Sequence, residues 1–453
     1  MAEQIAFSKS EPLREEIAKI EVGQTTVAPA IVRGLIVAFV AFVIAVPLFE
    51  WVAIVRASAT EATEPAWSHL IGLPREISFA LADADRAQAD RWGRTVTANR
   101  AVLASLESFE NALEDESRLG RLLRPPMQII LSRWLGVGNE QVYRGRDGWL
   151  FYRPDVEYVT GRAFLVPAQL ERRASSASEW TDAPQPDPRV AIVQFKRDLE
   201  ARGITLVVMP TPVKATIQPG SLAGAYADWP TPLQNPSYSA LTRDLRGEGV
   251  LVFDPAQIFV DARRRSGGPA YLSTDTHWRP EMMQLAATRL GELLRSRVSL
   301  PTLPPPGYRT ERREVRNTGD ITLMLDLPPG QLLYPPESVS LRRVLAADGT
   351  PWQPSRSADI LLLGDSFSNI YALKSMGWGD SGGFAEQLSY ELQRPVDRIV
   401  QNNDGAFATR AMLWRGLGRS ADRLSGKRVV IYQFATRELA FGDWKVLRLK
   451  RDP

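Results

Sequence analysis

The strongest constraint on the fold is a series of short apolar runs that begins near residue 139. Near-continuous apolar runs of this length, rather than alternating ones, are typical of strands buried on both faces of a parallel sheet. Helical patterns lie between the runs. Strands that alternate with helices predict an α/β fold with a doubly wound, mostly parallel sheet. The apolar runs are WLFY (149–152), ITLVVMP (204–210), VLVFDP (250–255), DILLLGDS (359–366), RIVQNN (398–403) and RVVIYQF (428–434), and the helical patterns include AIVQFKRDLEARG (191–203), EMMQLAATRLGELLRSR (281–297) and GGFAEQLSYELQR (382–394).

Polar residues follow most of these predicted strands at the point where each strand ends. In open α/β sheets, ligands bind outside the carboxyl ends of the strands. The sequence therefore predicts a binding site at this edge of the sheet. The residues in question are Thr211, Lys214, Asp254, Asp365, Ser366, Asn402, Asn403, Asp404, Arg437 and Glu438.

Composition narrows the possible chemistry. The 453 residues include 55 basic and 52 acidic side chains, a formal net charge of +3, and no basic run stands out. Nucleic acid is therefore not an expected partner. The chain contains no cysteine, which excludes thiolate catalysis, thiolate metal sites and disulfide bonds.

A second feature lies near the N-terminus. The run GLIVAFVAFVIAVPLFEWVAIV, residues 34–55, has the length needed to cross a bilayer as a helix, and Arg33 and Arg56 flank it. A cleaved signal peptide fits poorly, because the run is long and starts about thirty residues into the chain. The alternative is a buried helix of a soluble domain.

The charges around this run indicate an orientation. Lys9, Arg14, Lys19 and Arg33 precede it, whereas Arg56 and Arg75 follow it. The positive-inside rule then favours a cytoplasmic N-terminus and a translocated body. We expect a single-pass protein of a bacterial inner membrane. Its parts would be a cytoplasmic tail (1–33), a transmembrane signal anchor (34–55), a periplasmic helical stalk or solvated spacer (56–138) and a periplasmic catalytic domain (139–453).

The chain has only two histidines, and one of them, His277, lies two residues after Asp275 in YLSTDTHW. Ser366 follows the apolar strand pattern LLLG, where Gly364 allows a tight turn. A serine nucleophile needs a base, and the base needs an orienting carboxylate. Asp275, His277 and Ser366 therefore form a candidate triad. The alternatives are a structural GDS turn, with Asp365 as a helix cap, and a metal-binding DTH segment.

Five segments together resemble the SGNH-hydrolase-like alginate O-acetyltransferase family of the AlgX/AlgJ type, and they occur in its order. The resemblance covers residues 139–453 and includes the permuted order in which the Asp/His motif precedes the nucleophile. It implies that Ser366 is the nucleophile, His277 the general base and Asp275 its orienting carboxylate. The segments are VYRGRDGWLFY (142–152), LVVMPTPVKATIQP (206–219), YLSTDTHW (271–278), LLLGDSFSNIY (361–371) and VVIYQFATREL (429–439).

The sequence departs from the usual SGNH pattern, because the glycine and asparagine blocks that supply oxyanion donors are not evident. Asn402 or Asn403, the backbone N–H of Ser366, or Arg410 is expected to replace them. Among residues expected to face the substrate, Lys214 could meet a uronate carboxylate and Trp278 could stack on a sugar ring; structural contacts are the alternative for each. Tyr371 and Arg437 complete this group.

The resemblance implies an O-acetyltransferase that passes acetyl groups to hydroxyls of an exported, alginate-like polysaccharide through an acyl-enzyme. Such an enzyme is expected to need no cofactor and no metal. The resemblance also implies a membrane-spanning acyltransferase as the acetyl donor. Two other functions are also compatible with this sequence. One is a carbohydrate acetyl esterase with the same triad, and the other is a non-catalytic polysaccharide-binding component of the export machinery.

Overall fold

The computed structural model describes residues 28–56, 70–86, 90–116, 118–176, 183–402, 405–417 and 422–449. Most of the predicted tail (residues 1–27) and the candidate residue Asn403 lie outside these ranges. The chain divides into two compact units, Met1–Arg124 and Pro125–Pro453. The second unit thus includes residues 125–138, which the sequence assigned to the stalk.

Helices make up the described part of the first unit. α4 and α5 pack against each other, and Arg94 forms an ion pair with Asp85 at 3.2 Å. The RPP segment at residues 124–126 lies inside α6 and coincides with the boundary between the units. The role of this region as a stalk stays a prediction. The helices are α2 (Pro29–Arg56), α4 (Leu73–Arg86), α5 (Arg91–Glu116) and α6 (Arg118–Ile130).

Helix α2 contains the whole apolar run 34–55. Leu35, Phe39 and Ile44 each expose more than half of their surface. Judged by length and hydropathy, none of the helices in the described ranges qualifies as a membrane-crossing segment. The predicted membrane span therefore stays a prediction.

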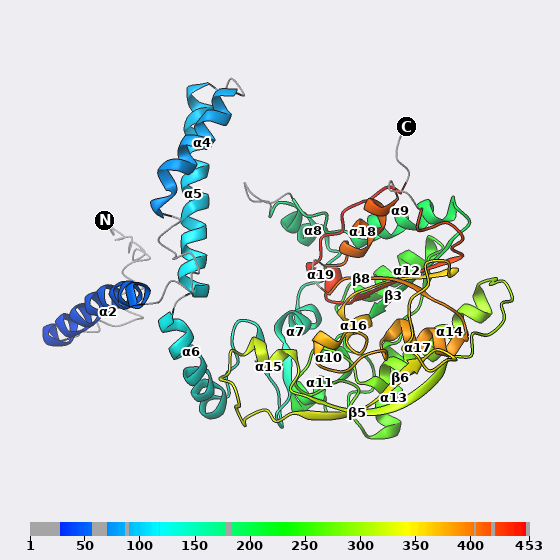
Figure 1. Cartoon of the computed structure of the whole chain (residues 1–453). Coiled ribbons are helices and arrows are strands. Elements are labelled where there is room, and N and C mark those ends of the chain that lie inside the picture. The colour runs from blue at the N-terminus through cyan, green and yellow to red at the C-terminus, as the bar shows by residue number, and fades with distance from the viewer. Residues whose placement is uncertain are drawn as a thin grey trace, which may run out of the picture. The chain divides into compact units, whose positions relative to one another are not determined.

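A five-stranded, fully parallel sheet forms the centre of the second unit, in the spatial order β4-β3-β9-β7-β8 (Figure 1). Five of the six apolar runs supply its strands, which confirms the predicted parallel α/β fold. Ile431 on β9 lies between Val207 of β3 and Leu362 of β7. The strands are β3 (Thr205–Thr211), β4 (Leu251–Val252), β7 (Ile360–Gly364), β8 (Asp397–Val400) and β9 (Val429–Ala435).

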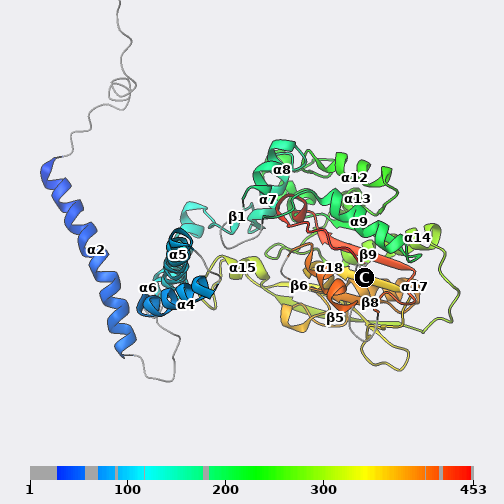
Figure 2. The same ribbon diagram turned by 90° about the horizontal axis from the view of Figure 1, so that it is seen from above.

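Both faces of the sheet are buried, and this explains why its strands are apolar without alternation. On β7, Ile360 and Leu362 pack into one hydrophobic cluster, whereas Leu361 and Leu363 pack into another on the opposite face. Figure 2 shows helices on both sides of β9. The first cluster includes α13 (Ala256–Ser266), α14 (Pro280–Arg297) and α17 (Phe384–Leu392), and the second includes α7 (Arg153–Thr160), α9 (Pro188–Glu200), α12 (Tyr238–Gly247) and α18 (Ala408–Gly416).

Two antiparallel strand pairs lie outside the central sheet. The WLFY run does not join the parallel sheet; it forms β2 (Leu150–Tyr152), which pairs with β1 (Val142–Arg144). The intervening Asp147 and Gly148 both have positive φ, as the Asp-Gly turn of a tight hairpin requires. The second antiparallel pair, β5 (Arg309–Asn317) with β6 (Glu337–Leu345), was not expected. Its first strand is almost entirely exposed and charged, so it carries no apolar run.

Short helices follow the carboxyl ends of three central strands and surround the edge where a site is expected. α10 follows β3, α16 follows β7 and α19 follows β9. This places the chain segments after LVVMPT, LLLG and VVIYQFA at one edge of the sheet. The remaining short elements are η2 (Leu131–Leu135), α8 (Pro167–Ala174), α10 (Lys214–Ile217), α11 (Pro219–Leu222), η3 (Gly224–Tyr226), α15 (Asp320–Met324), α16 (Ser366–Asn369), η4 (Lys374–Met376) and α19 (Glu438–Phe441).

Candidate active site

Ser366 lies in a tight turn that joins β7 to α16. A Cβ at Gly364 would come within 2.4 Å of the Ser368 hydroxyl, so only glycine fits there. Gln433 on β9 holds the turn from the side: its Oε1 accepts from the Asp365 backbone N–H at 3.0 Å and from Ser368 Oγ at 2.7 Å. Asp365 in turn caps α16 by accepting from the Phe367 N–H at 2.9 Å. The nucleophile turn is therefore fixed to the neighbouring strand.

His277 and Asp275 lie near the end of a narrow loop that a β-bridge between Tyr271 and Trp278 closes. The loop is anchored from outside as well. Glu337 accepts from both the backbone N–H and the hydroxyl of Ser273, at 2.8 and 2.6 Å. Lys214 donates to the Ser273 carbonyl at 3.2 Å. These contacts hold the acid–base pair in one position.

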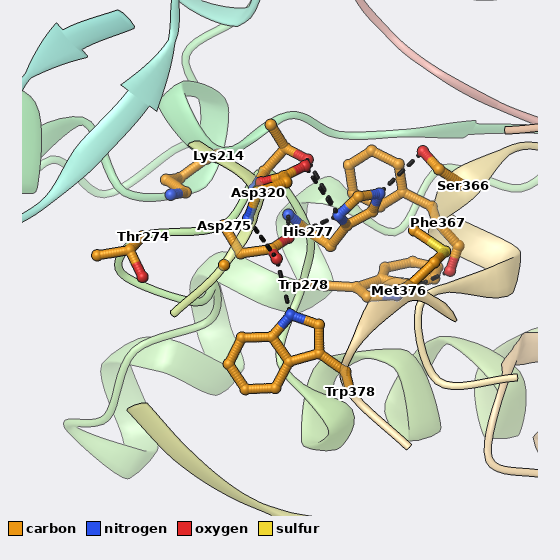
Figure 3. Close-up of polar contacts among 12 residues, drawn as sticks. Lys214, Thr274, Asp275, His277, Trp278, Asp320, Ser366, Phe367, Met376 and Trp378 are labelled. Carbon is orange, nitrogen blue, oxygen red and sulfur yellow. Dashed lines mark hydrogen bonds and ion pairs between the residues drawn. The ribbon is translucent and has the colours of Figure 1, made fainter. Parts of the chain in front are cut away.

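The three predicted triad residues meet in one line of hydrogen bonds (Figure 3). His277 Nε2 lies 2.8 Å from Ser366 Oγ, and His277 Nδ1 lies 2.6 Å from Asp275 Oδ1. All three residues are buried. With an ionised Asp275 as acceptor, Nδ1 carries the proton, and Nε2 is free to accept the serine proton. The arrangement suits activation of a serine hydroxyl as a nucleophile.

The Asp275 carboxylate is stabilised by donors from three parts of the chain. Besides the His277 ring, two groups donate to Asp275 Oδ2. Trp378 Nε1 lies 2.7 Å from this oxygen, and the Asp320 backbone nitrogen lies 3.1 Å from it. Burial alone raises the pKa of Asp275, but the hydrogen bonds and charge of His277, together with Trp378, lower it to about 2. Burial lowers the pKa of His277, but Asp275 outweighs this effect and the pKa is raised overall.

Asp320 is a second carboxylate beside the imidazole. It accepts from the Thr276 N–H at 2.8 Å and from the Thr276 hydroxyl at 2.6 Å, and its Oδ2 lies 3.7 Å from His277 Nδ1. Burial and the negative charge of Asp275 raise the pKa of Asp320 to about 6. Its charge therefore changes in the pH range in which histidine also titrates.

The donor atoms of Asp275, His277 and Asp320 lie within 4.8 Å of one another, close enough to be considered as metal ligands. Their lone pairs are already engaged, however. Asp275 bonds to the imidazole and to Trp378, and Asp320 bonds to Thr276. These hydrogen bonds favour a proton relay over metal coordination.

A small pocket of about 30 Å³ opens beside Ser366, and its lining includes Asn402, Thr409 and Arg437. Within the described ranges, the Ser366 backbone N–H donates to no acceptor, so it is available to stabilise an oxyanion. The Asn402 side chain also lines the pocket, but its amide donates to Met376 Sδ at 3.6 Å and its Oδ1 accepts from Asn369 at 2.8 Å. The Ser366 N–H is therefore the predicted oxyanion donor in this pocket that has no other acceptor among the described residues.

Arg437 is the cation of this pocket. Its guanidinium donates to the buried Asp155 at 2.9 Å and lies over the rings of Tyr152 and Phe367, at 5.3 and 5.9 Å from their centroids. Burial lowers the pKa of Arg437, but Asp155 and Glu438 raise it above its ordinary value. A positive charge paired with Asp155 therefore lies in the lining of this pocket, and the expected substrate contact of Arg437 stays a prediction.

Comparison with known proteins identifies the family. A family model described as "SGNH hydrolase-like domain, acetyltransferase AlgX" matches residues 142–436, a range that includes the whole triad. The chain belongs to this family. The resemblance drawn from the five sequence segments is thereby confirmed.

Two curated relatives agree with this assignment. The "Probable alginate O-acetylase AlgJ" of Pseudomonas aeruginosa is 29% identical over 266 residues, which cover 56% of this chain and 61% of the relative, less than two thirds of its length. The protein of the same description from Pseudomonas putida is 25% identical over 350 residues, covering 75% of this chain and 80% of the relative. Among solved structures, the O-acetyltransferase domain of Pseudomonas putida AlgJ matches with a TM-score of 0.48 at 23% identity, covering 66% of this chain and 92% of that one.

Lys214 and Trp278, expected to face the substrate of this AlgX-type domain, have structural positions instead. The Lys214 ammonium is buried and donates to the Leu150 carbonyl at 2.7 Å, which ties β2 to the catalytic loop. Burial lowers the pKa of Lys214 to about 8, although Asp275 and Asp320 act in the opposite direction. The Trp278 ring is fully buried and donates to the Phe367 carbonyl at 3.1 Å, so no face is available to a sugar.

Tyr371 and Arg410 also belong to the interior. The Tyr371 hydroxyl donates to the Trp278 carbonyl at 2.7 Å. Arg410 donates to the Tyr432 hydroxyl at 3.2 Å and to the Lys445 carbonyl at 3.1 Å, and it does not line the pocket beside Ser366. Both serve packing in this structure. Asn403 lies outside the described residues, so its expected role stays a prediction.

Sequence reasoning missed three residues that support the triad: Asp320, Trp378 and Gln433. Each had a signal in the sequence. A glycine, Gly319, directly precedes Asp320, and the structure shows that it has positive φ with no room for a Cβ. Trp378 lies between two glycines in the run GWG, and both glycines have positive φ. Gln433 is an isolated polar residue in an apolar strand, and such a residue usually has a buried partner.

Asp320→Asn tests whether this second carboxylate adjusts the base. An ionised Asp320 favours protonated His277, and a base must be neutral to accept the serine proton. Without the charge, the pKa of His277 falls, so the acidic limb of the pH profile of kcat/KM should shift to lower pH. Thermal melting should stay nearly unchanged, because asparagine retains an acceptor for Thr276.

Asp326→Asn is the matched control, since Asp326 is exposed and lies just after α15. This variant should leave the pH profile unchanged. An acidic limb in Asp320→Asn that coincides with that of the unaltered chain, or one displaced to higher pH, would exclude Asp320 from tuning His277.

Proposed function

We propose that this chain is a membrane-anchored periplasmic O-acetyltransferase that passes acetyl groups to hydroxyls of an exported, alginate-like polysaccharide through acetyl-Ser366. The observation that carries the proposal is the line of hydrogen bonds from Ser366 through His277 to Asp275, at 2.8 and 2.6 Å. Membership in the AlgX-type acetyltransferase family and the names of the AlgJ relatives support the choice of acetyl group and polymer.

In the first half-reaction, Ser366 Oγ attacks the carbonyl carbon of the acetyl donor while its proton moves to His277 Nε2. The developing oxyanion accepts a hydrogen bond from the Ser366 N–H. The tetrahedral intermediate then collapses, the donor's leaving group departs with the proton from Nε2, and acetyl-Ser366 remains. Asp275 stabilises the imidazolium throughout. Loss of a single oxyanion donor typically lowers kcat by about 10²–10³-fold.

In the second half-reaction, a sugar hydroxyl takes the place of the leaving group. Its oxygen attacks the acetyl carbonyl and its proton moves to His277 Nε2. The same proton then returns to Ser366 Oγ when the ester bond to serine breaks. The net change is one ester bond broken and one formed, with no change of oxidation state, so these steps need no redox cofactor.

The pocket beside Ser366 suits a small acyl group. About 10–15 Å³ of such space holds one water-sized group. A volume of about 30 Å³ therefore has room for about two, such as the methyl group and carbonyl oxygen of an acetyl ester.

The donor and the location complete the proposal. Acetyl groups start as a cytoplasmic thioester, so a membrane-spanning acyltransferase is the proposed upstream partner. The exposed apolar side chains of α2 and the basic residues before it support an anchor with a cytoplasmic N-terminus. The catalytic unit would then meet the polymer on the outer side of the inner membrane.

Acetylation of Ser366 by an activated ester tests the mechanism. p-Nitrophenyl acetate carrying a ¹³C-labelled acetyl group should give an adduct on the Ser366 peptide by mass spectrometry. The adduct should be absent in Ser366→Ala and fall by orders of magnitude in His277→Ala. When uronic-acid oligosaccharide is then added, the label should appear as sugar ester in excess of free acetate.

Ser368→Ala is the matched control, because Ser368 lies two residues away and its hydroxyl bonds to Gln433 rather than to His277. It should still be labelled at Ser366. Labelling that survives without His277 would contradict the mechanism. Release of the label only as free acetate would indicate an esterase, and normal polymer acetylation in cells with Ser366→Ala would indicate a non-catalytic component.

The proposed topology has its own test. Protease added to intact spheroplasts should digest the catalytic unit of the full chain while an N-terminal tag stays protected. A cytoplasmic marker protein serves as the control for intact membranes. Protection of the catalytic unit together with the marker would contradict a periplasmic location.

A further inference from the structure

A second and larger cavity lies in the catalytic unit and shares no lining residue with the pocket beside Ser366. Its volume is about 480 Å³, within the range of ligand-binding sites. It lies where the end of α13 and the turn at residues 267–269 face α11 and the turn after η3, and Figure 1 shows α11 and α13 in the same part of the molecule. We call it the arginine groove. Its lining includes Trp149, Gln218, Ser221, Asp228, Arg263 and Arg264.

The charged side chains of the groove favour an anion. Two guanidinium groups, Arg263 and Arg264, face a single carboxylate, Asp228. Arg263 Nε is buried and has no hydrogen-bond partner among the described residues. A buried donor without a partner is costly, so a bound acceptor would remove a real penalty. Guanidinium groups pair with carboxylates through two parallel hydrogen bonds.

Aromatic rings accompany these charges. Trp149 lines the groove. Tyr226 and Trp229 flank the lining residues Ala227 and Asp228 in the chain, and their exposed rings lie 5.4 Å apart, edge to face, but they do not line the groove themselves. Aromatic rings offer flat apolar surfaces with polar edges, which suit the C–H faces of sugar rings. The Trp149 ring and the two arginines in one lining therefore fit an acidic sugar better than a simple inorganic anion.

The groove is also connected to the catalytic loop. Gln218 Oε1 accepts from the backbone N–H groups of Ala270 and Tyr271, both at 2.7 Å. Tyr271 forms one side of the bridge that closes the loop of Asp275 and His277. A chain that occupies the groove thus lies against the segment that leads directly to the base.

We propose that the arginine groove binds a stretch of uronate-type polysaccharide, separate from the acetyl pocket. The guanidinium groups would hold sugar carboxylates, and the rings would hold sugar faces. The inference rests on the proposed function for its choice of acceptor. It also accounts for how a pocket as small as that beside Ser366 can act on a long polymer, since the groove supplies the binding surface that the pocket lacks.

The test measures binding without turnover. The full chain carrying Ser366→Ala should bind a polymannuronate hexamer, and binding should weaken with added salt. A neutral mannan hexamer should bind at least about tenfold more weakly, and Arg264→Gln should raise the Kd of the uronate hexamer by about tenfold, as expected for a lost charged hydrogen bond. Arg264 is exposed, so the substitution should not affect folding.

Arg265→Gln is the matched control: it removes the same charge from the same end of α13, but Arg265 does not line the groove. It should change the Kd less than about twofold. Equal effects of the two substitutions, no effect of Arg264→Gln, or equally tight binding of polyphosphate of matched charge would overturn the inference. If Ser366 of the unaltered chain is acetylated but the uronate hexamer does not bind to the Ser366→Ala chain, the proposed groove is wrong and the proposed function stands. If the hexamer binds but Ser366 is not acetylated, the proposed function is wrong and the groove stands.

Discussion

The buried charge of Asp275 is the interaction on which the rest of the site depends. An unpaired carboxylate in this position would be costly, and removing one partner from a buried pair typically costs about 3–5 kcal/mol. Here the charge receives donors from the imidazole of His277, the indole of Trp378 and the backbone of Asp320. These donors come from the catalytic loop, from the glycine-rich segment before α17 and from the start of α15. The carboxylate therefore brings three distant segments together at the edge of the sheet.

The nucleophile is held by an independent set of contacts. Gln433 on β9 and the narrow space at Gly364 fix the turn of Ser366, and neither contacts Asp275 or His277. The two sides of the site meet at the bond between His277 and Ser366, and the bond from the Trp278 indole to the Phe367 carbonyl also joins them. This division has a consequence for mechanism. Contacts with strand β9 fix the position of Ser366. Asp275 and Asp320, which lie outside the central sheet, adjust the pKa of His277.

Sequence patterns predicted those parts of the molecule that depend on local order along the chain. The central strands were found because burial on both faces makes them continuously apolar. The candidate triad was found because the chain has only two histidines and because five segments resemble the AlgX/AlgJ-type family. Parts that depend on tertiary packing were missed. The charged strand β5 has no apolar face, and the roles of Asp320 and Trp378 arise only when they approach Asp275. Trp278 and Lys214 were expected at the substrate, yet residues next to a catalytic motif can equally serve to hold it.

The state of the imidazole tests the central claim most directly. Because the chain contains two histidines, a nitrogen NMR spectrum of ¹⁵N-histidine-labelled protein contains the signals of only two rings. At a pH above the raised pKa of His277, the neutral ring should carry its proton on Nδ1 and have an unprotonated Nε2, and Asp275→Asn should abolish this preference. A neutral ring protonated on Nε2, or a preference that survives Asp275→Asn, would contradict the claim that the buried carboxylate prepares His277 to accept the Ser366 proton.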